Sequence, residues 1–198
     1  QTIDLTKNGV GGMDTGTVPN EGFVGIYAIY NPVTMTSGLL AVDASSVKLP
    51  EIYNETNMPT GYTASALLTV VPVKASQFIK LFVLDRQINT PAILLYSGSE
   101  ITKGVDVPVS SMIPLNTRYI SGIARQSSTA EGFLSTTIAS DRNNLSCQQM
   151  TNHVSPGRDT LGNFSDVIIS NSGYVVVSTS NATLGNAIYY IYISKYSI

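Results

Sequence analysis

Long apolar runs separated by short polar links dominate the sequence. The run at residues 22–32, GFVGIYAIYNP, has apolar side chains at nearly every position and ends at Asn31-Pro32. Successive side chains of a β-strand point to opposite faces of the sheet, so this run predicts a strand that is apolar on both faces. A second sheet of the same chain, another copy of the chain, or a ligand could cover the second face.

The same pattern predicts β-strands along the whole chain, most of them bounded by Gly, Pro, Asn or Ser. The expected strands are 22–30, 37–43, 62–73, 78–85, 91–96, 105–109, 117–125, 132–139, 144–150, 166–170, 173–179 and 187–194. The stretch 63–69, TASALLT, has helix-forming residues, but its β-branched continuation favours a strand. The links predict one hairpin through 31–37 and a second within 169–177, turning on Asn171-Ser172-Gly173.

Two segments lack strand patterns. Residues 44–61 carry Pro50, Pro59 and Gly61 around Tyr53 and predict an ordered surface loop. The polar stretch 151–163, TNHVSPGRDTLGN, predicts the longest turn-like insertion of the second half.

Composition supports an all-β protein. Hydrophobic residues make up 43% of the chain and charged residues 12%, against about 25% charged residues in an ordinary soluble domain. Ser, Thr, Asn and Gly replace the missing charge, which favours strands joined by turns. We expect an antiparallel β-sandwich, either one large or two small packed sandwiches. The expected parts are a Gly-rich connector (1–21), a first β module (22–96) and a second β module carrying polar tip loops (97–198).

Charge and cysteine content exclude several classes of function. The net charge is −2 and the eleven basic residues are scattered, so the basic stripe of a nucleic-acid-binding protein is absent. No apolar run approaches the roughly 20 residues of a membrane helix. Cys147 is the only cysteine, which excludes an intrachain disulfide. The chain opens on Gln1, and we interpret it as a piece of a longer polypeptide.

Two motifs suggest catalysis, but their contexts do not support it. DTGT at 14–17 matches the signature of aspartic proteases, in which two such carboxylates share a proton. It follows Gly-Gly-Met instead of an apolar strand and has no second copy, so we interpret it as a turn. His153 is the only histidine, and without a Gly-x-Ser-x-Gly elbow it is typical of a surface loop. Paired carboxylates for glycoside hydrolysis cannot be identified from spacing.

No motif indicates a metal or a cofactor. One Cys and one His exclude an ordinary structural zinc site. DRNN at 141–144 clusters oxygen ligands but lacks the Asp-x-Asp-x-Asp repeat of a calcium loop, and we interpret it as a solvated turn. We therefore expect no cofactor, no metal and no enzymatic activity.

Aromatic residues leave a saccharide-binding hypothesis open. The chain has eleven Tyr and no Trp. Tyr rings can stack on sugars, but Tyr is also a good strand former that packs on cross-strand neighbours. We expect packing for the strand residues Tyr27, Tyr30, Tyr189, Tyr190 and Tyr192. Tyr53 and Tyr62, which flank the loop at 44–61, are less constrained.

Two stretches resemble a known module. GGMDTGTVPNEGFVGIYAIYNPVTMTSGLLAV and NMPTGYTASALLTVVP resemble a module near the C-terminal ends of tailed-bacteriophage tail fibre proteins. The shared elements are a Gly-Gly-x-Asp-x-Gly connector, GFV.IYAIYNP, LLAV and NMP.GYTASAL. The resemblance covers residues 9 to about 72 and is weaker afterwards; Met35-Thr36 and VKASQFIK at 73–80 depart from it.

This resemblance implies binding to a host bacterial surface receptor, most readily a saccharide, otherwise an outer-membrane protein. It also implies a homotrimer, contacts with other fibre modules, and a location in the virion, extracellular after host lysis. We then expect a trimer contact over 23–30 instead of a ligand. The alternatives are a non-recognising trimerisation module and a polysaccharide-depolymerising or deacetylating domain. The expected receptor-binding residues are Tyr53, Arg142, Asn143, Asn144, His153, Arg158 and Asp159.

Overall fold

The computed structural model describes residues 1–170 and 173–198. These residues form thirteen β-strands and no helix, and all the strands pair antiparallel, which confirms the predicted all-β class. The strands are β1 (Glu21–Asn31), β2 (Thr36–Asp43), β3 (Ala64–Lys74), β4 (Gln77–Phe78), β5 (Phe82–Leu84), β6 (Gln87–Gly98), β7 (Val105–Pro108), β8 (Tyr119–Ser128), β9 (Gly132–Ala139), β10 (Gln148–Val154), β11 (Asp159–Ile168), β12 (Tyr174–Asn181) and β13 (Ala187–Ser197). None of the described residues belongs to a helix of the length and apolarity that a membrane crossing requires.

The chain divides into two compact units, which we describe separately. Unit 1 comprises Gln1–Arg86, Ile113–Asn116 and Ile198, and unit 2 comprises Gln87–Met112 and Thr117–Ser197. The division between Arg86 and Gln87 precedes β6, whereas the boundary expected after residue 96 falls inside that strand.

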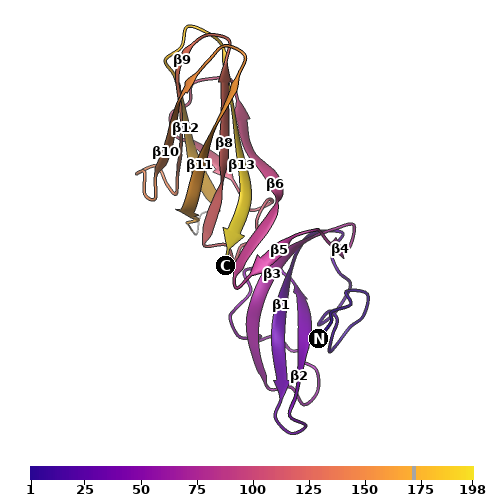
Figure 1. The fold of residues 1–198 in the computed structure, drawn as a ribbon. Helices are drawn as coiled ribbons and strands as arrows, with labels where there is room; N and C mark the ends of the chain where they lie inside the picture. The colour runs from indigo at the N-terminus through magenta and orange to yellow at the C-terminus, as the bar shows by residue number, and fades with distance from the viewer. Residues whose placement is uncertain (171–172) are drawn as a thin grey trace. The chain divides into compact units, whose positions relative to one another are not determined.

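Unit 1 is built on one sheet of order β2-β1-β3-β4. β1 and β2 form the predicted hairpin through residues 31–37, with Tyr27 opposite Leu40. β3 pairs with the other side of β1, so β1 is central, as Figure 1 shows. The predicted strand 78–85 is instead two short strands, β4 and β5, separated by residues 79–81, and left-handed backbone at Ala75, Ser76 and Asp85 bounds this stretch on both sides.

An irregular N-terminal segment covers one face of this sheet. Leu5 and Met13 pack into a buried cluster with Val24 and Ile26 of β1. The backbone of the segment also follows the edge of β2, where Gly11 N–H donates to the Leu39 carbonyl at 2.7 Å. Residues 1–21 are therefore irregular, as expected, but they are part of the fold of unit 1 and do not simply connect to it.

The loop at 44–61 covers the opposite face. Leu49 lies over Gly25, where an added Cβ would be 2.0 Å from Leu49 Cδ1, so any larger residue would force the Leu49 side chain to shift. The Tyr27 ring meets the Tyr53 ring edge-on at 5.5 Å, and the Tyr27 hydroxyl donates to the Pro50 carbonyl at 2.6 Å. The second apolar face of β1 is thus covered by the chain's own irregular loop, whereas a second sheet or another protomer was expected.

A distant stretch of sequence fixes this loop. Asn116, in the short segment 113–116 that belongs to unit 1, is buried beside Leu49. Its side-chain amide accepts from Leu49 N–H at 2.9 Å and donates to the Leu49 carbonyl at 2.8 Å. Both backbone groups of a buried loop residue are thereby paired, as burial requires.

Unit 2 is a β-sandwich, as predicted. Within this unit, one sheet has the order β10-β9-β12-β7 and the other has the order β11-β8-β13-β6 (Figure 1). Leu134 and Val154 of the first sheet form a buried cluster with Ala187 and Tyr189 of the second. Sheet-on-sheet packing of this kind encloses a core about 10 Å thick.

A buried amide links the two sheets. Gln126 of β8 is fully buried, and its Nε2 donates to Thr136 Oγ1 at 2.7 Å and to the Met150 carbonyl at 3.2 Å. Its Oε1 accepts from Asn152 Nδ2 at 2.8 Å. Every polar atom of the Gln126 amide group is therefore partnered, so the network holds one register between the sheets.

Two sequence predictions for unit 2 were wrong. The stretch 151–163, expected to be a turn-like insertion, contains the end of β10 and the start of β11, with only 155–158 between the two strands. The expected hairpin at 169–177 does not form, because β11 and β12 belong to different sheets. Of its expected turn, Asn171 and Ser172 lie outside the described residues.

Candidate functional site

The loop between β9 and β10, residues 140–147, is held in one conformation by its own hydrogen bonds. Asp141 Oδ1 accepts from the N–H groups of Asn143 and Leu145, both at 3.0 Å. These bonds, with the Leu145 N–H the largest cause, lower the pKa of the Asp141 carboxyl. The Asn143 amide is used inside the loop, since Nδ2 donates to Asp141 Oδ2 at 3.1 Å. The DRNN stretch is therefore a turn, as interpreted, and its carboxylate serves the loop.

This loop lines a pocket at the edge of unit 2. The pocket has a volume of about 300 Å³. Its lining residues are Lys103, Gly104, Arg142, Asn144, Val176 and Ser178. The sheet register explains why these residues meet: Val176 of β12 lies opposite both Asp106 of β7 and Ala139 at the end of β9.

Hydrogen-bond donors dominate this pocket. Arg142 Nη2 contacts Asp106 Oδ2 at 2.9 Å, and this hydrogen bond raises the pKa of the Arg142 guanidinium. Asn144 adopts a left-handed backbone with φ of 59°, which asparagine tolerates better than most residues. Within the described residues, neither the Asn144 amide nor the Lys103 ammonium has a hydrogen-bonding or ionic partner. These two groups are available to a ligand.

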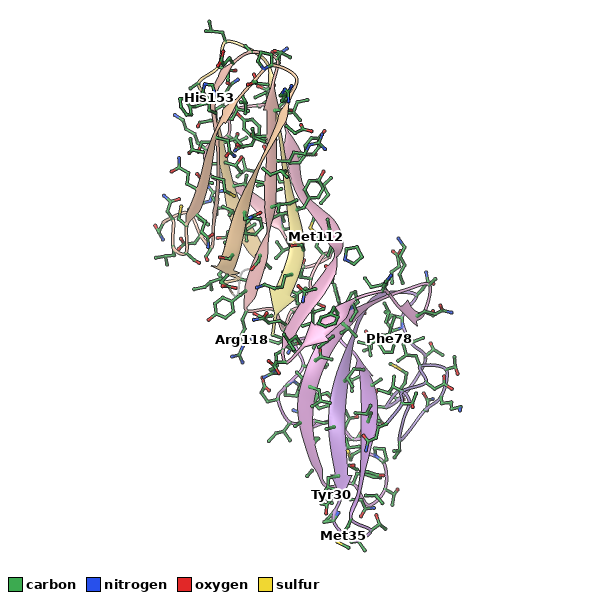
Figure 2. All side chains as sticks on the ribbon, in the orientation of Figure 1. Tyr30, Met35, Phe78, Met112, Arg118 and His153 are labelled. Carbon is green, nitrogen blue, oxygen red and sulfur yellow. The ribbon has the colours of Figure 1, made fainter. Side chains whose placement is uncertain are left out.

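The other expected residues of unit 2 lie at the opposite end of the sandwich. Figure 2 shows His153 and Arg118 at the two ends of unit 2. The loop at 140–147 is at the Arg118 end, because Ser140 Oγ donates to the Ile168 carbonyl and Ile169 N–H donates to the Arg118 carbonyl. β10 separates the two ends by seven residues, which is about 20 Å of strand.

At the His153 end most polar groups are engaged. His153 Nε2 lies 3.7 Å from Glu131 Oε1, and the ring meets Phe133 edge-on at 4.9 Å. Asp159 Oδ2 contacts an Arg125 guanidinium nitrogen at 2.6 Å. Arg158 is exposed in the turn between β10 and β11. The structure therefore brings Arg142, Asn143 and Asn144 together, and His153, Arg158 and Asp159 together, but not all six.

Tyr53, the remaining expected residue, belongs to unit 1 and is only 7% exposed. Its hydroxyl donates to Asp14 Oδ2 at 2.8 Å, and burial, followed by this hydrogen bond, raises the pKa of the phenol. The bond joins the N-terminal segment to the loop at 44–61. Tyr53 thus offers little ring surface to a sugar.

A second pocket, of about 240 Å³, adjoins Tyr53 in unit 1 and includes Asp14 and Asp43. The Asp14 carboxylate accepts from Tyr53 and from Thr15 N–H, and Asp43 Oδ1 accepts from the N–H and hydroxyl of Ser45. Asp14 is the acid of the DTGT motif, and its position in an irregular segment agrees with the turn interpretation. Two of its three carboxylates, those of Asp14 and Asp43, already have intramolecular partners, and we therefore rank this pocket as the weaker candidate.

Four of the five strand tyrosines pack as expected, and Tyr30 does not. Tyr27 and Tyr189 are fully buried. Tyr190 and Tyr192 stack on each other at 6.2 Å with an interplanar angle of 22°, and the Arg125 guanidinium lies 5.6 Å from the Tyr190 ring centroid. The faces of these rings therefore have partners within the chain, apart from Tyr30, which is 41% exposed.

The described residues contain no group of three or more His, Cys, Asp or Glu side chains that could hold a metal ion. Sequence reasoning also missed part of the pocket in unit 2, namely Lys103, Val176 and Ser178. Nothing in the sequence marks them, because only the pairing of β12 with β7 and β9 brings them to the loop at 140–147.

No protein-family model matches the chain, and no curated protein matches it. The chain is similar to a chain in the solved structure of infectious bursal disease virus, Gx strain, at 13% sequence identity and a TM-score of 0.24. The match covers 91% of this chain and 53% of that chain, so this chain spans about half the length of the solved chain. A likeness this distant carries nothing over to the pocket.

Proposed function

We propose that this chain is a receptor-binding module of a tailed-bacteriophage tail fibre. On this proposal the pocket lined by Lys103, Arg142 and Asn144 binds a saccharide of the bacterial surface. The resemblance of residues 9 to about 72 to tail fibre modules supports the phage assignment. The observation that carries saccharide binding is a pocket in which the Asn144 amide, on a loop with its own hydrogen bonds, and the Lys103 ammonium are both unpartnered, because sugars are recognised through directional hydrogen bonds to preformed groups.

The proposed affinity is low for each single site and high for a whole phage particle, which carries many sites. We propose a dissociation constant of about 1 mM for each single site, and several linked copies raise the apparent affinity by about 10² or more. A homotrimer and several fibres would supply those copies. Recognition in this proposal requires no catalytic step.

Binding of the purified chain to bacterial strains with defined deletions in surface polysaccharide synthesis tests the proposal. We expect binding to at least one parent strain and its loss in a polysaccharide-deficient derivative. Asn144→Gly keeps the left-handed backbone but removes the amide, and should reduce cell binding. Asn54→Ala, at the pocket of unit 1, is the matched control and should bind as the wild type does. Equal binding to parent and deletion strains would refute saccharide recognition.

An assembly role is a second candidate, favoured by one observation. The segment 78–84, FIKLFVL, is almost entirely apolar, yet Phe82 is 66% exposed and Leu84 59% exposed. Exposed apolar segments of this kind are typical of association surfaces. If the chain acts only in assembly, Phe82→Ser should lower the oligomeric state measured by analytical ultracentrifugation, and the wild-type chain should bind neither the parent strains nor the deletion strains.

A further inference from the structure

We infer that the ligand of the pocket in unit 2 is an acidic sugar, whose carboxylate or phosphate group binds between Lys103 and Arg142. This inference rests on the function proposed above and adds the chemical class of the ligand. It follows from the charge of the pocket, from the groups already in use there, and from its size.

The pocket has an excess of positive charge. Lys103 and Arg142 line it, and the only carboxylate in contact with either cation, within the described residues, is Asp106. Unit 2 as a whole has six basic and six acidic residues, counted from the sequence over Gln87–Met112 and Thr117–Ser197. Two cations against one carboxylate is therefore a local imbalance, and the pocket favours an anion over a neutral ligand.

Asp106 occupies only part of the Arg142 guanidinium. The contact runs from Nη2 to Oδ2, and the two side chains are 65% and 39% exposed. A guanidinium has five N–H donors, so Arg142 keeps donors for a second anion. An exposed pair of this kind contributes little stability, so a ligand anion can share the guanidinium at small cost.

The remaining lining fits a sugar ring better than a free inorganic ion. Ser178 Oγ accepts from Gly104 N–H at 2.9 Å, which leaves its hydroxyl proton to donate to a ligand oxygen. Asn144 can both donate and accept, which suits ring hydroxyls, and Val176 supplies an apolar surface. A volume of about 300 Å³ is at the lower end of ligand pockets, which matches one monosaccharide rather than an oligosaccharide.

NMR titration of the ¹⁵N-labelled full chain with four probes tests the inference. The probes are D-glucuronic acid, D-glucose 6-phosphate, D-glucose and inorganic phosphate. The two acidic sugars should shift the amide signals of Gly104, Asn144 and Ser178 and bind at least fivefold more tightly than D-glucose. Raising the salt concentration should weaken the acidic sugars, since the pocket is open to solvent.

Two variants give effects of opposite sign. Lys103→Gln should weaken D-glucuronic acid binding about fivefold, because it removes one cation from the pocket. Asp106→Asn should strengthen it about threefold, because it removes the competing carboxylate while keeping the shape of the side chain. Lys48→Gln makes the same change of charge at an exposed residue of unit 1 and should have no effect.

Each contrary result has a distinct meaning. Equal binding of D-glucose and D-glucuronic acid at this pocket would overturn the acidic class while leaving saccharide recognition intact. Inorganic phosphate binding as tightly as D-glucose 6-phosphate would overturn the sugar ring as part of the ligand. Absence of binding by all four probes, together with no binding to any bacterial strain, would overturn both this inference and the proposed function.

Discussion

Units 1 and 2 bury their apolar strands in different ways, and the difference bears on where a ligand can bind. Unit 2 places one sheet against another and leaves its loops to project from the ends of the sandwich. Unit 1 has a single sheet, and the segments 1–21 and 44–61, irregular in backbone, cover its two faces. The irregular segments of unit 1 therefore form its core, while the loop at 140–147 of unit 2 is free to line a pocket.

The two pockets differ accordingly. In unit 1 the pocket carboxylates of Asp14 and Asp43 accept hydrogen bonds from Tyr53 and Ser45, which hold the covering segments in place. In unit 2 the Lys103 and Asn144 side chains have no partner within the described residues. Polar groups with intramolecular partners stabilise the fold. Polar groups without such partners are the ones that can bind a ligand.

The largest effect is expected for a charge placed under the N-terminal segment. Ile26→Asp puts a carboxylate into the cluster with Leu5 and Met13, and should lower the free energy of unfolding of unit 1 by about 4 kcal/mol. Urea denaturation followed by two-dimensional NMR reports the two units separately. Val33→Asp, at an 87% exposed hairpin position, is the control and should be tolerated. A stable unit 1 in the Ile26→Asp variant would contradict the burial of this face.

A double-mutant cycle tests how the second face is covered. Leu49→Ala should cost about 3 kcal/mol, because it leaves a cavity over β1. Gly25→Ala should cost about 1 to 2 kcal/mol in the wild type, because its methyl group meets Leu49 Cδ1. In the Leu49→Ala background that second cost should vanish. Additive losses in urea denaturation would show that Leu49 does not lie over Gly25.

In unit 2 the corresponding test removes the buried amide between the sheets. Gln126→Leu should lower the free energy of unfolding by about 2 kcal/mol, because Thr136 and Asn152 lose their partner while remaining at least partly buried. The pocket proposed to bind a sugar lies on other strands, so the D-glucuronic acid affinity of the folded variant should be unchanged. A free energy of unfolding equal to that of the wild type would mean that the Gln126 hydrogen bonds make no net contribution to stability.

A smaller effect is expected from the bond that joins the two covering segments of unit 1. Tyr53→Phe should cost about 1.5 kcal/mol at pH 7, because Asp14 loses a hydrogen-bond donor. The pKa of the Tyr53 phenol is raised in the folded state, so its stabilisation is complete below about pH 10 and is lost as the pH rises further. The difference between variant and wild type should therefore shrink above pH 10 in urea denaturation. A difference that grows with pH would contradict the assignment.

The smallest effect is expected at the His153 end of unit 2, and it tests which end of the unit carries the binding site. Arg158→Ala, in the exposed turn between β10 and β11, should change both stability and D-glucuronic acid affinity by less than about 0.5 kcal/mol. The same truncation at Arg142, a lining residue, should weaken the sugar measurably. If Arg158→Ala abolishes binding, the site lies at the His153 end.

Apolar runs were enough to predict most strands, because alternation and turn residues are local signals. β11 was missed in part, because this strand buries few large side chains apart from Phe164 and Val167 and reads as polar from Asp159 to Asn163. Left-handed Asp166 lies at the point where its register with β8 shifts. A polar edge strand with a bulge has no apolar pattern from which to predict it.

Only part of the candidate site could be predicted from the sequence. Arg142 and Asn144 stand out in a polar turn, whereas Lys103 is one cation among several in the sequence. Its position follows from long-range pairing of β7 with β12 and of β12 with β9, which no local pattern encodes. Tyr53 was expected to expose its ring, but it is buried. Its contact with Asp14 joins residues 39 positions apart, and a long-range contact of this kind leaves no local pattern in the sequence.

The central claim is that unit 1 is closed by its own segments while unit 2 carries the ligand pocket. Mapping the amide shifts of the full chain during titration with D-glucuronic acid tests it most directly. The account predicts that the shifts concentrate at Gly104, Asn144 and Ser178, with the signals around Tyr53 unchanged. Shifts concentrated around Tyr53, or at His153 and Arg158, would contradict it.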